Sequence, residues 1–228
     1  MPNPLGTLIK RLTIVFIFSI AFAYIESAVV VYLRAIFYPE GFSFPLLEFG
    51  TNPLWKKFLL IETGRKAATL VLILTGCWLF GRNKCQRLAY FLTIFAVWDI
   101  FYYIWLKVFL DWPGAIMDWD ILFFIPVIWA SPVLAPVVAS VTMLAFAVII
   151  LYLDSQSKYL RVTWAEWGGL LVAILVVVVS FCIGGLHATE QDYQSYFSWP
   201  LFGLGEVIGI TILARCFIKS KQFFARTS

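Results

Sequence analysis

The residues in this sequence that could do chemistry are ionisable side chains set inside long apolar runs. An ionised group at the centre of a bilayer costs roughly 2.5–3.5 kcal/mol on insertion scales, so such groups usually face the protein interior and mark a functional site. The candidate binding residues that share this setting are Glu26, Glu62, Arg65, Asp99, Tyr103 and Glu206. Because they come from four different apolar runs, we expect them to converge on one polar site in the outer half of the membrane.

The second apolar run carries its own opposite charges. Glu62 lies three residues before Arg65 and four before Lys66. These spacings place the three side chains on one face of a helix, so the run can neutralise its own carboxylate. A structural salt bridge and a binding role are equally compatible with this pattern.

Asp99 is the strongest single candidate for a functional acid. It lies near the middle of its apolar run, and no basic residue lies within one helical turn of it. Asp99, Tyr103 and Lys107 follow one another at intervals of four residues and therefore share one helical face. We expect Asp99 to face a cavity that it shares with Glu26 and Glu62.

A rim of polar and aromatic residues is expected at the outer edge of this site. Its members are Lys107, Trp112, Asp120 and His187. Asp120 opens the fourth apolar run, where a carboxylate is favourable at the positively polarised end of a helix. His187 ends the fifth run and is more simply explained as a boundary residue than as a ligand. The sequence assigns no catalytic residue.

Several common site types lack support. The chain has a single histidine and no CxxCH motif, so no haem is bound by two histidines of this chain. It has no GxxxxGK[ST] motif and no GxGxxG motif following a strand, so nucleotide-binding motifs are missing. We predict no cofactor and leave a metal ion open as a ligand of the carboxylates. Lys and Arg are scattered rather than clustered, so no nucleic-acid partner is expected.

The composition indicates the elements that position these residues. A chain of 228 residues that is 62% hydrophobic and 13% charged is typical of a polytopic membrane protein. We predict an all-α membrane helix bundle that forms a single transmembrane domain over residues 1–228. Runs of about twenty apolar residues predict about six spans, at 10–36, 57–80, 88–109, 121–153, 164–186 and 200–218. Pro126, Pro132 and Pro136 predict that the fourth helix is kinked or broken.

The loops between the spans differ in charge. Most Lys and Arg residues fall at the two termini and in the second and fourth loops, whereas Asp and Glu gather in the others. Basic loops stay on the cytoplasmic side of a membrane. We therefore predict a bacterial inner-membrane protein with both termini in the cytoplasm.

Three functions fit this arrangement. The first is binding or translocation of a cation, a proton or a small polar solute at the outer polar site. The second is an accessory or structural subunit of a larger membrane complex or homo-oligomer. The third is a membrane enzyme with a periplasm-facing carboxylate and histidine site that acts on a lipid-like substrate. The inner half offers no matching polar path, which is an argument against simple translocation.

The segments WDIFYYIWLK, WP, WDILFFIP and WASPVLAP, together with Glu62-x-x-Arg65, carry a resemblance. With these motifs the chain resembles a group of uncharacterised bacterial multi-pass integral membrane proteins over about spans two to four. The resemblance implies an integral membrane protein and implies no activity.

Overall fold

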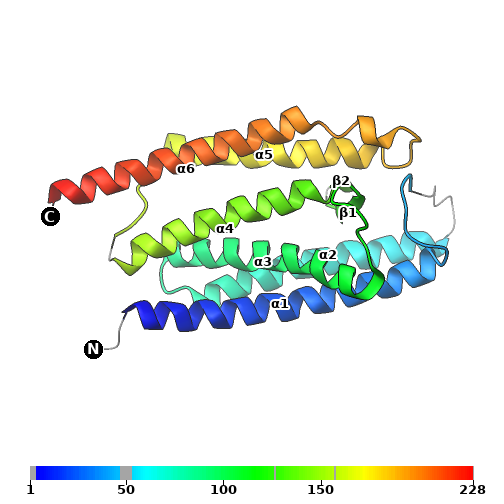
Figure 1. Ribbon diagram of the computed structural model, residues 1–228, viewed down its shortest axis with the longest axis horizontal. Helices are drawn as coiled ribbons and strands as arrows, with labels where there is room; N and C mark the ends of the chain where they lie inside the picture. The colour runs from blue at the N-terminus through cyan, green and yellow to red at the C-terminus, as the bar shows by residue number, and fades with distance from the viewer. Residues whose placement is uncertain (1–3, 47–52, 126, 157, 228) are drawn as a thin grey trace.

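The structure, a computed structural model, describes residues 4–46, 53–125, 127–156 and 158–227. Long helices run side by side along the long axis of the molecule, and a short β-hairpin lies at one end (Figure 1). The helices are α1 (Pro4–Phe37), α2 (Pro53–Phe80), α3 (Lys84–Leu110), α4 (Leu134–Ser155), α5 (Trp164–Leu186) and α6 (Trp199–Thr227). The strands are β1 (Trp119–Phe123) and β2 (Trp129–Pro132), and a short 3-10 helix covers Tyr193–Ser195. The expected all-α class is confirmed, with the hairpin as an addition.

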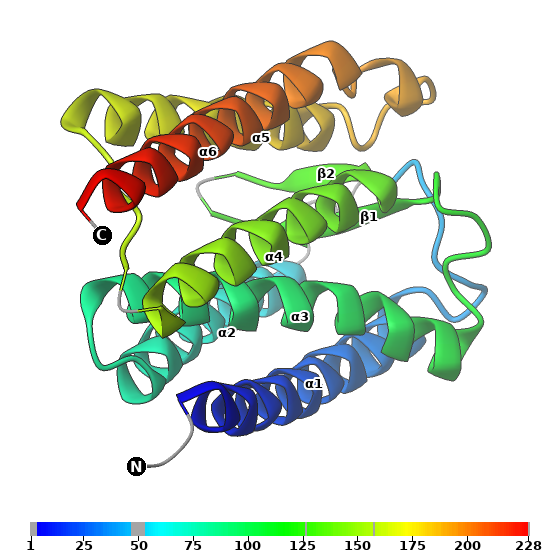
Figure 2. The ribbon, with the colours of Figure 1, turned by 60° about the vertical axis from the view of Figure 1, so that its left-hand side comes forward.

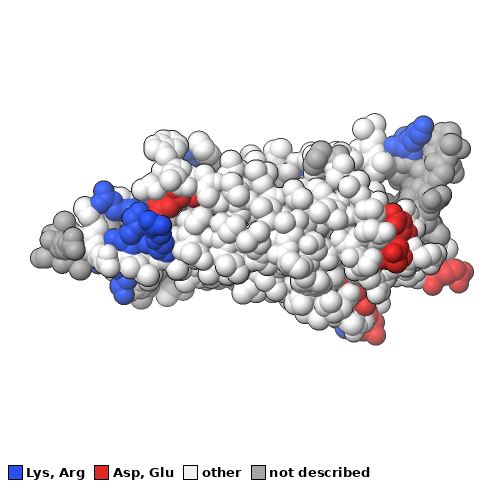
Figure 3. All heavy atoms as spheres, turned by 90° about the horizontal axis from the view of Figure 1, so that it is seen from above, with Lys and Arg blue, Asp and Glu red and all other residues white. Residues whose placement is uncertain are grey.

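The surface of the bundle suits a membrane. Within the described residues, five helical segments are long and apolar enough to cross a bilayer: Gly6–Phe37, Lys84–Leu110, Leu134–Ser155, Trp164–Leu186 and Tyr193–Phe223. In the face seen in Figure 3, most Lys and Arg lie at the end that carries the termini, and a few lie at the opposite end, where most of the Asp and Glu lie; the middle is largely uncharged. Helix α2 is not among the five, so the expected count of six spans stays a prediction.

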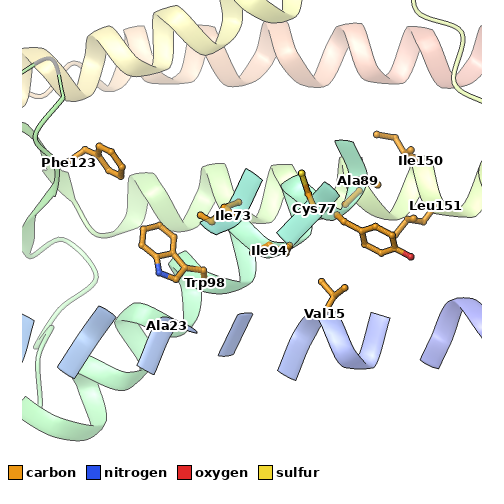
Figure 4. Packing of buried hydrophobic residues seen from close by; sticks show 12 residues of the cluster. Val15, Ala23, Ile73, Cys77, Ala89, Ile94, Trp98, Phe123, Ile150 and Leu151 are labelled. Carbon is orange, nitrogen blue, oxygen red and sulfur yellow. The ribbon is translucent and has the colours of Figure 1, made fainter. Parts of the chain in front are cut away.

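Helix α3 is the centre of the packing. It lies against α1, α2 and α4, whereas α5 and α6 pack on each other and contact the rest mainly through β2 and α4 (Figure 2). The main apolar core fills the space between the first four helices, as the labelled side chains in Figure 4 show. Its members include Val15, Ala23, Ile73, Ile94, Trp98 and Leu151.

Local signals fix several of the helix ends. The side chain of Asn83 accepts a hydrogen bond from the backbone N–H of Gln86 at the start of α3. Thr163 and Glu166 form a capping box at the start of α5, in which each side chain satisfies a backbone donor of the other. The expected span 164–186 coincides with α5, and the spans 10–36, 57–80, 88–109 and 200–218 lie within α1, α2, α3 and α6.

The expected helix over 121–153 is wrong in its first third. The strands Trp119–Phe123 and Trp129–Pro132 pair as an antiparallel hairpin, in which Asp120 faces Ser131 and Ile121 faces Ala130, and α4 begins only at Leu134. Proline removes a backbone donor and is tolerated only in the first turn of a helix, where Pro136 lies. Aromatic and β-branched residues on both sides of the turn favour strands. Pro126, part of the same expectation, lies outside the described residues.

The hairpin lies directly on α5. A Cβ atom placed on Gly184 would collide with the carbonyl oxygen of Ala130, and one placed on Gly185 would collide with that of Ile128. Only glycine permits this close approach of two backbones. The hairpin is therefore held between α5 on one side and the α1–α4 group on the other.

Candidate functional site

A cavity of about 470 Å³ lies between α1, α2 and the hairpin, toward the end of the molecule opposite the termini. Much of its wall is apolar, formed by Val30, Leu33, Phe37, Phe42, Leu46, Phe58, Leu59, Ile121, Phe124 and Ile128. Its polar wall is formed by Arg34, Tyr38, Lys56, Glu62, Arg65, Lys66, Tyr102 and Asp120. Small-molecule sites commonly have volumes of about 300–1,000 Å³ and combine apolar walls with a few polar groups.

Arg65 joins two of the predicted acids. Its Nε lies 3.0 Å and 3.1 Å from the two carboxylate oxygens of Glu62, and its Nη2 lies 2.6 Å from Glu62 Oε2. Its Nη1 forms an ion pair with Glu26 Oε1, which comes from the neighbouring helix α1. The structure therefore brings Glu26, Glu62 and Arg65 together.

Lys66 completes this inner network. Its Nζ lies 3.0 Å from Glu26 Oε1, and both side chains are almost fully buried. The ammonium group lies within 5.6–5.8 Å of the ring centres of Trp98, Tyr102 and Phe123. Aromatic faces attract a cation at these distances, so the rings help to hold the charge away from water.

A second ion pair connects α1 with the hairpin. Arg34 Nη2 donates to Asp120 Oδ1 at 3.0 Å, and the two residues are 7% and 2% exposed. The guanidinium carbon lies 4.0 Å from the ring centre of Phe42 and 3.8 Å from that of Trp112. The remaining Nη1 of Arg34 is buried and has no hydrogen-bond partner within the described residues.

The lining of the cavity carries more positive than negative charge. Four basic side chains, Arg34, Lys56, Arg65 and Lys66, face two acidic ones, Glu62 and Asp120. Glu26 lies behind the wall and pairs with Arg65 and Lys66, so among the described residues the excess is one positive charge, that of the exposed Lys56.

The structure places Asp99 and Glu206 elsewhere. Asp99 Oδ2 accepts a hydrogen bond of 2.8 Å from Ser140 of α4, and Glu206 Oε2 accepts one of 2.7 Å from Thr142. Neither acid lines the cavity, and within the described ranges neither has a basic partner at ion-pair distance. The two acids thus contact α4 rather than the network around Arg65.

Asp99, Tyr103 and Lys107, which were expected to share one face of α3, lie in different surroundings. Tyr103 is buried and packs against Tyr102 and Trp112, with ring centres 5.0 Å and 6.4 Å apart. Lys107 lies at the end of α3, where its Nζ donates to the carbonyl oxygens of Asp111 and Pro113. Lys107 therefore binds the backbone that follows the C-terminal end of α3.

Among the expected rim residues, Trp112 and Asp120 contact Arg34 at the cavity, whereas His187 lies outside it. The His187 ring stacks on Tyr196 with a centroid distance of 3.8 Å, and its Nδ1 lies 2.6 Å from Glu190 Oε1. This hydrogen bond lowers the pKa of the Glu190 carboxyl below its usual 4.5. Within the described part of the chain, no group of three or more His, Cys, Asp or Glu side chains could hold a metal ion.

Sequence reasoning missed the contribution of Arg34 to the site. Arg34 ends the first apolar run and Asp120 begins the fourth, so both sit in apolar surroundings near the same end of the bundle. Two opposite charges in such settings are a signal for a buried pair, because neither is stable alone. The hairpin that joins them could not be read from the apolar pattern.

Comparison of the chain with protein-family models, with curated proteins and with solved structures gives no match. The function is therefore inferred from the geometry of the cavity and its charges.

Proposed function

We propose that this chain is a multi-pass membrane protein that binds a small solute in the cavity between α1, α2 and the hairpin. The observation that carries the proposal is the combination of an apolar wall with two buried charge networks around a space of ligand size. Ion pairs that only hold helices together have no need of such a space. A bare cation is the less suitable solute, because every acid at the cavity already has a basic partner.

The proposed setting is a bacterial inner membrane with six spans and both termini in the cytoplasm. Both termini lie at the same end of the bundle, where Lys and Arg gather on the face seen in Figure 3. Basic residues favour the cytoplasmic side, so the cavity opens toward the periplasm. The charges of α2 are compatible with a sixth span because Glu62, Arg65 and Lys66 are neutralised by one another and by Glu26. A reporter fused after Arg82 is expected to be active in the cytoplasm, and periplasmic activity would contradict this topology.

Native mass spectrometry after purification in a mild detergent tests the binding role. We expect the wild-type protein to carry a co-purifying small molecule. The variant Leu33→Trp, which fills the cavity, is expected to lose it, and Leu171→Trp on the exposed face of α5 is expected to keep it. Absence of any bound species, or equal retention by both variants, would contradict the proposal.

Proton exchange is a second candidate function. Asp99 and Glu206 each bond to a hydroxyl group of α4 instead of a basic side chain. A hydroxyl can donate to a carboxylate or accept from a carboxylic acid, so these sites tolerate both protonation states. Proteoliposomes with a pH-sensitive dye inside test this role: wild-type protein is expected to pass protons under an imposed potential and Asp99→Asn to pass fewer. Equal proton flux in the two samples would contradict it.

A further inference from the structure

We propose that the solute is an anionic amphiphile, in which one carboxylate or phosphate group is attached to a hydrocarbon body. This inference rests on the proposed binding function of the cavity. The chemical class of the solute follows from the charged and apolar residues that line the cavity.

The charge balance of the lining favours an anion. Four basic side chains stand against two acidic ones around the cavity, and Glu26 compensates only one more of the positive charges. A bound cation would add to the positive excess, and a neutral molecule would leave it in place. The excess charge is that of the exposed Lys56, and an anionic group bound beside it would give this ammonium group an opposite charge among the described residues.

One guanidinium nitrogen of Arg34 lacks a hydrogen-bond partner among the described residues. Nη2 of Arg34 donates to Asp120, whereas its Nη1 is buried and lacks a hydrogen-bond partner among the described residues. A buried donor without a partner is unfavourable. The planar guanidinium group is also well shaped for carboxylate and phosphate oxygens. We therefore expect the anionic group to contact the exposed Lys56 and, after a small shift that uncovers the buried Nη1, the guanidinium group of Arg34.

The apolar part of the lining favours a hydrocarbon. Phe37 and Phe58 pack edge to face with ring centres 4.9 Å apart, and they line the cavity together with Leu59 and Phe124. Free inorganic phosphate would leave this apolar wall in contact with water, which is unfavourable in proportion to its area. An amphiphile covers the apolar wall and neutralises the basic groups at once.

Competition against a photoactivatable fatty acid tests the proposal in protein reconstituted into nanodiscs. Cross-linked peptides are identified by mass spectrometry, and the competitors are dodecanoate, dodecyl phosphate, dodecanol and inorganic phosphate. We expect cross-links on the cavity segments of α1 and α2 that both anionic amphiphiles suppress at roughly tenfold lower concentration than dodecanol does. Inorganic phosphate is expected to have no effect.

The outcomes that overturn the proposal differ from those that overturn cavity binding. Equal suppression by dodecanol would refute the anionic class and leave cavity binding in place. Suppression by inorganic phosphate alone would show that the ligand is a free anion. No cross-link on the cavity segments, or equal cross-linking in Leu33→Trp and wild type, would refute both proposals.

Two variants test the assigned contact for the anionic group. Arg34→Lys keeps a positive charge opposite Asp120 but removes the guanidinium donor. Lys56→Gln removes an exposed charge for which no ion pair is found within the described residues. Each is expected to weaken competition by dodecanoate and dodecyl phosphate without changing competition by dodecanol. If both variants compete like the wild type, the assigned contact is wrong. Lys56→Gln decides the test if Arg34→Lys does not fold.

Discussion

Two groups of carboxylates in this bundle are held in opposite ways. At the cavity, Glu26, Glu62 and Asp120 each contact Arg or Lys. Along α4, Asp99 and Glu206 each contact only a hydroxyl group among the interactions found in the described ranges. The first group requires both partners of each pair to be charged, whereas the second group does not.

The kind of partner determines whether an acid in each group can change its charge. Removing one partner of a buried ion pair leaves an uncompensated charge and costs several kcal/mol, so the cavity networks are rigid and fixed in charge. The acids along α4 bond to hydroxyl groups, which can donate to a carboxylate or accept from a carboxylic acid, so these hydrogen bonds do not require the charged form of the acid. This difference is the basis for proposing ligand binding at the cavity and proton exchange along α4.

The largest expected effect comes from breaking the pair between α1 and the hairpin. Arg34→Met leaves Asp120 buried without a basic partner at the hairpin, and we expect the free energy of unfolding to fall by about 3–5 kcal/mol. Denaturant unfolding in detergent measures this loss. The double variant Arg34→Met with Asp120→Leu removes both charges and is expected to recover most of it, so a double variant as unstable as the single one would contradict the role of the pair.

A smaller effect is expected where the hairpin lies on α5. Gly185→Ala places a methyl group against the carbonyl oxygen of Ile128 and forces the hairpin away from α5. Overpacking of this kind costs about 1–3 kcal/mol, and the resulting shift of Asp120 should also loosen Arg34. Gly168→Ala on the same helix meets nothing within 4 Å and is expected to be neutral or stabilising. Equal thermal stability of the two variants would show that the hairpin does not pack closely against Gly185 of α5.

The acids along α4 should respond less than those at the cavity. In Asp99→Asn the amide oxygen can still accept the hydrogen bond from Ser140, so the loss should be about 1 kcal/mol or less. Asp120→Asn, the matched change at the cavity, removes the charge opposite Arg34 and is expected to cost more. Similar unfolding midpoints for the two variants would remove the distinction between the two groups.

The smallest effect concerns Glu190, a partly exposed acid outside both groups. Because its folded-state pKa is lowered by the hydrogen bond with His187, its stabilising contribution is complete above 4.5 and is lost as the pH falls through the lowered value. Between about pH 6 and pH 3, the melting temperature of the wild type should fall slightly more than that of Glu190→Gln. Parallel curves would show that this contact adds nothing to stability.

The helices were predictable because their signals are local. The Thr163 and Glu166 capping box and the apolar run behind it define α5, and the expected span matches its bounds. The hairpin was not predictable in this way, because an apolar run such as 121–133 has the same periodicity in a buried strand as in a buried helix. Pro132 and Pro136 predicted an interruption of the fourth helix, but they did not predict that a β-hairpin replaces its first part.

The candidate site was only partly predictable for a related reason. The contact of Glu62 with Arg65 follows from their spacing on one helix, but their contact with Glu26 depends on how α1 and α2 are rotated. Asp99 lies on the side of α3 that faces α4, and nothing in the local sequence distinguishes that side from the one facing α1. Helix rotation is set by packing across the whole bundle, as the central position of α3 shows.

A high-resolution cryo-electron microscopy map of natively purified protein in nanodiscs tests the central claim most directly. We predict elongated density inside the cavity bordered by Arg34, Lys56 and Phe58, not accounted for by side chains, and absent in Leu33→Trp. A cavity closed by the protein's own side chains, or one without such density in the wild type, would contradict the claim that this space binds a ligand.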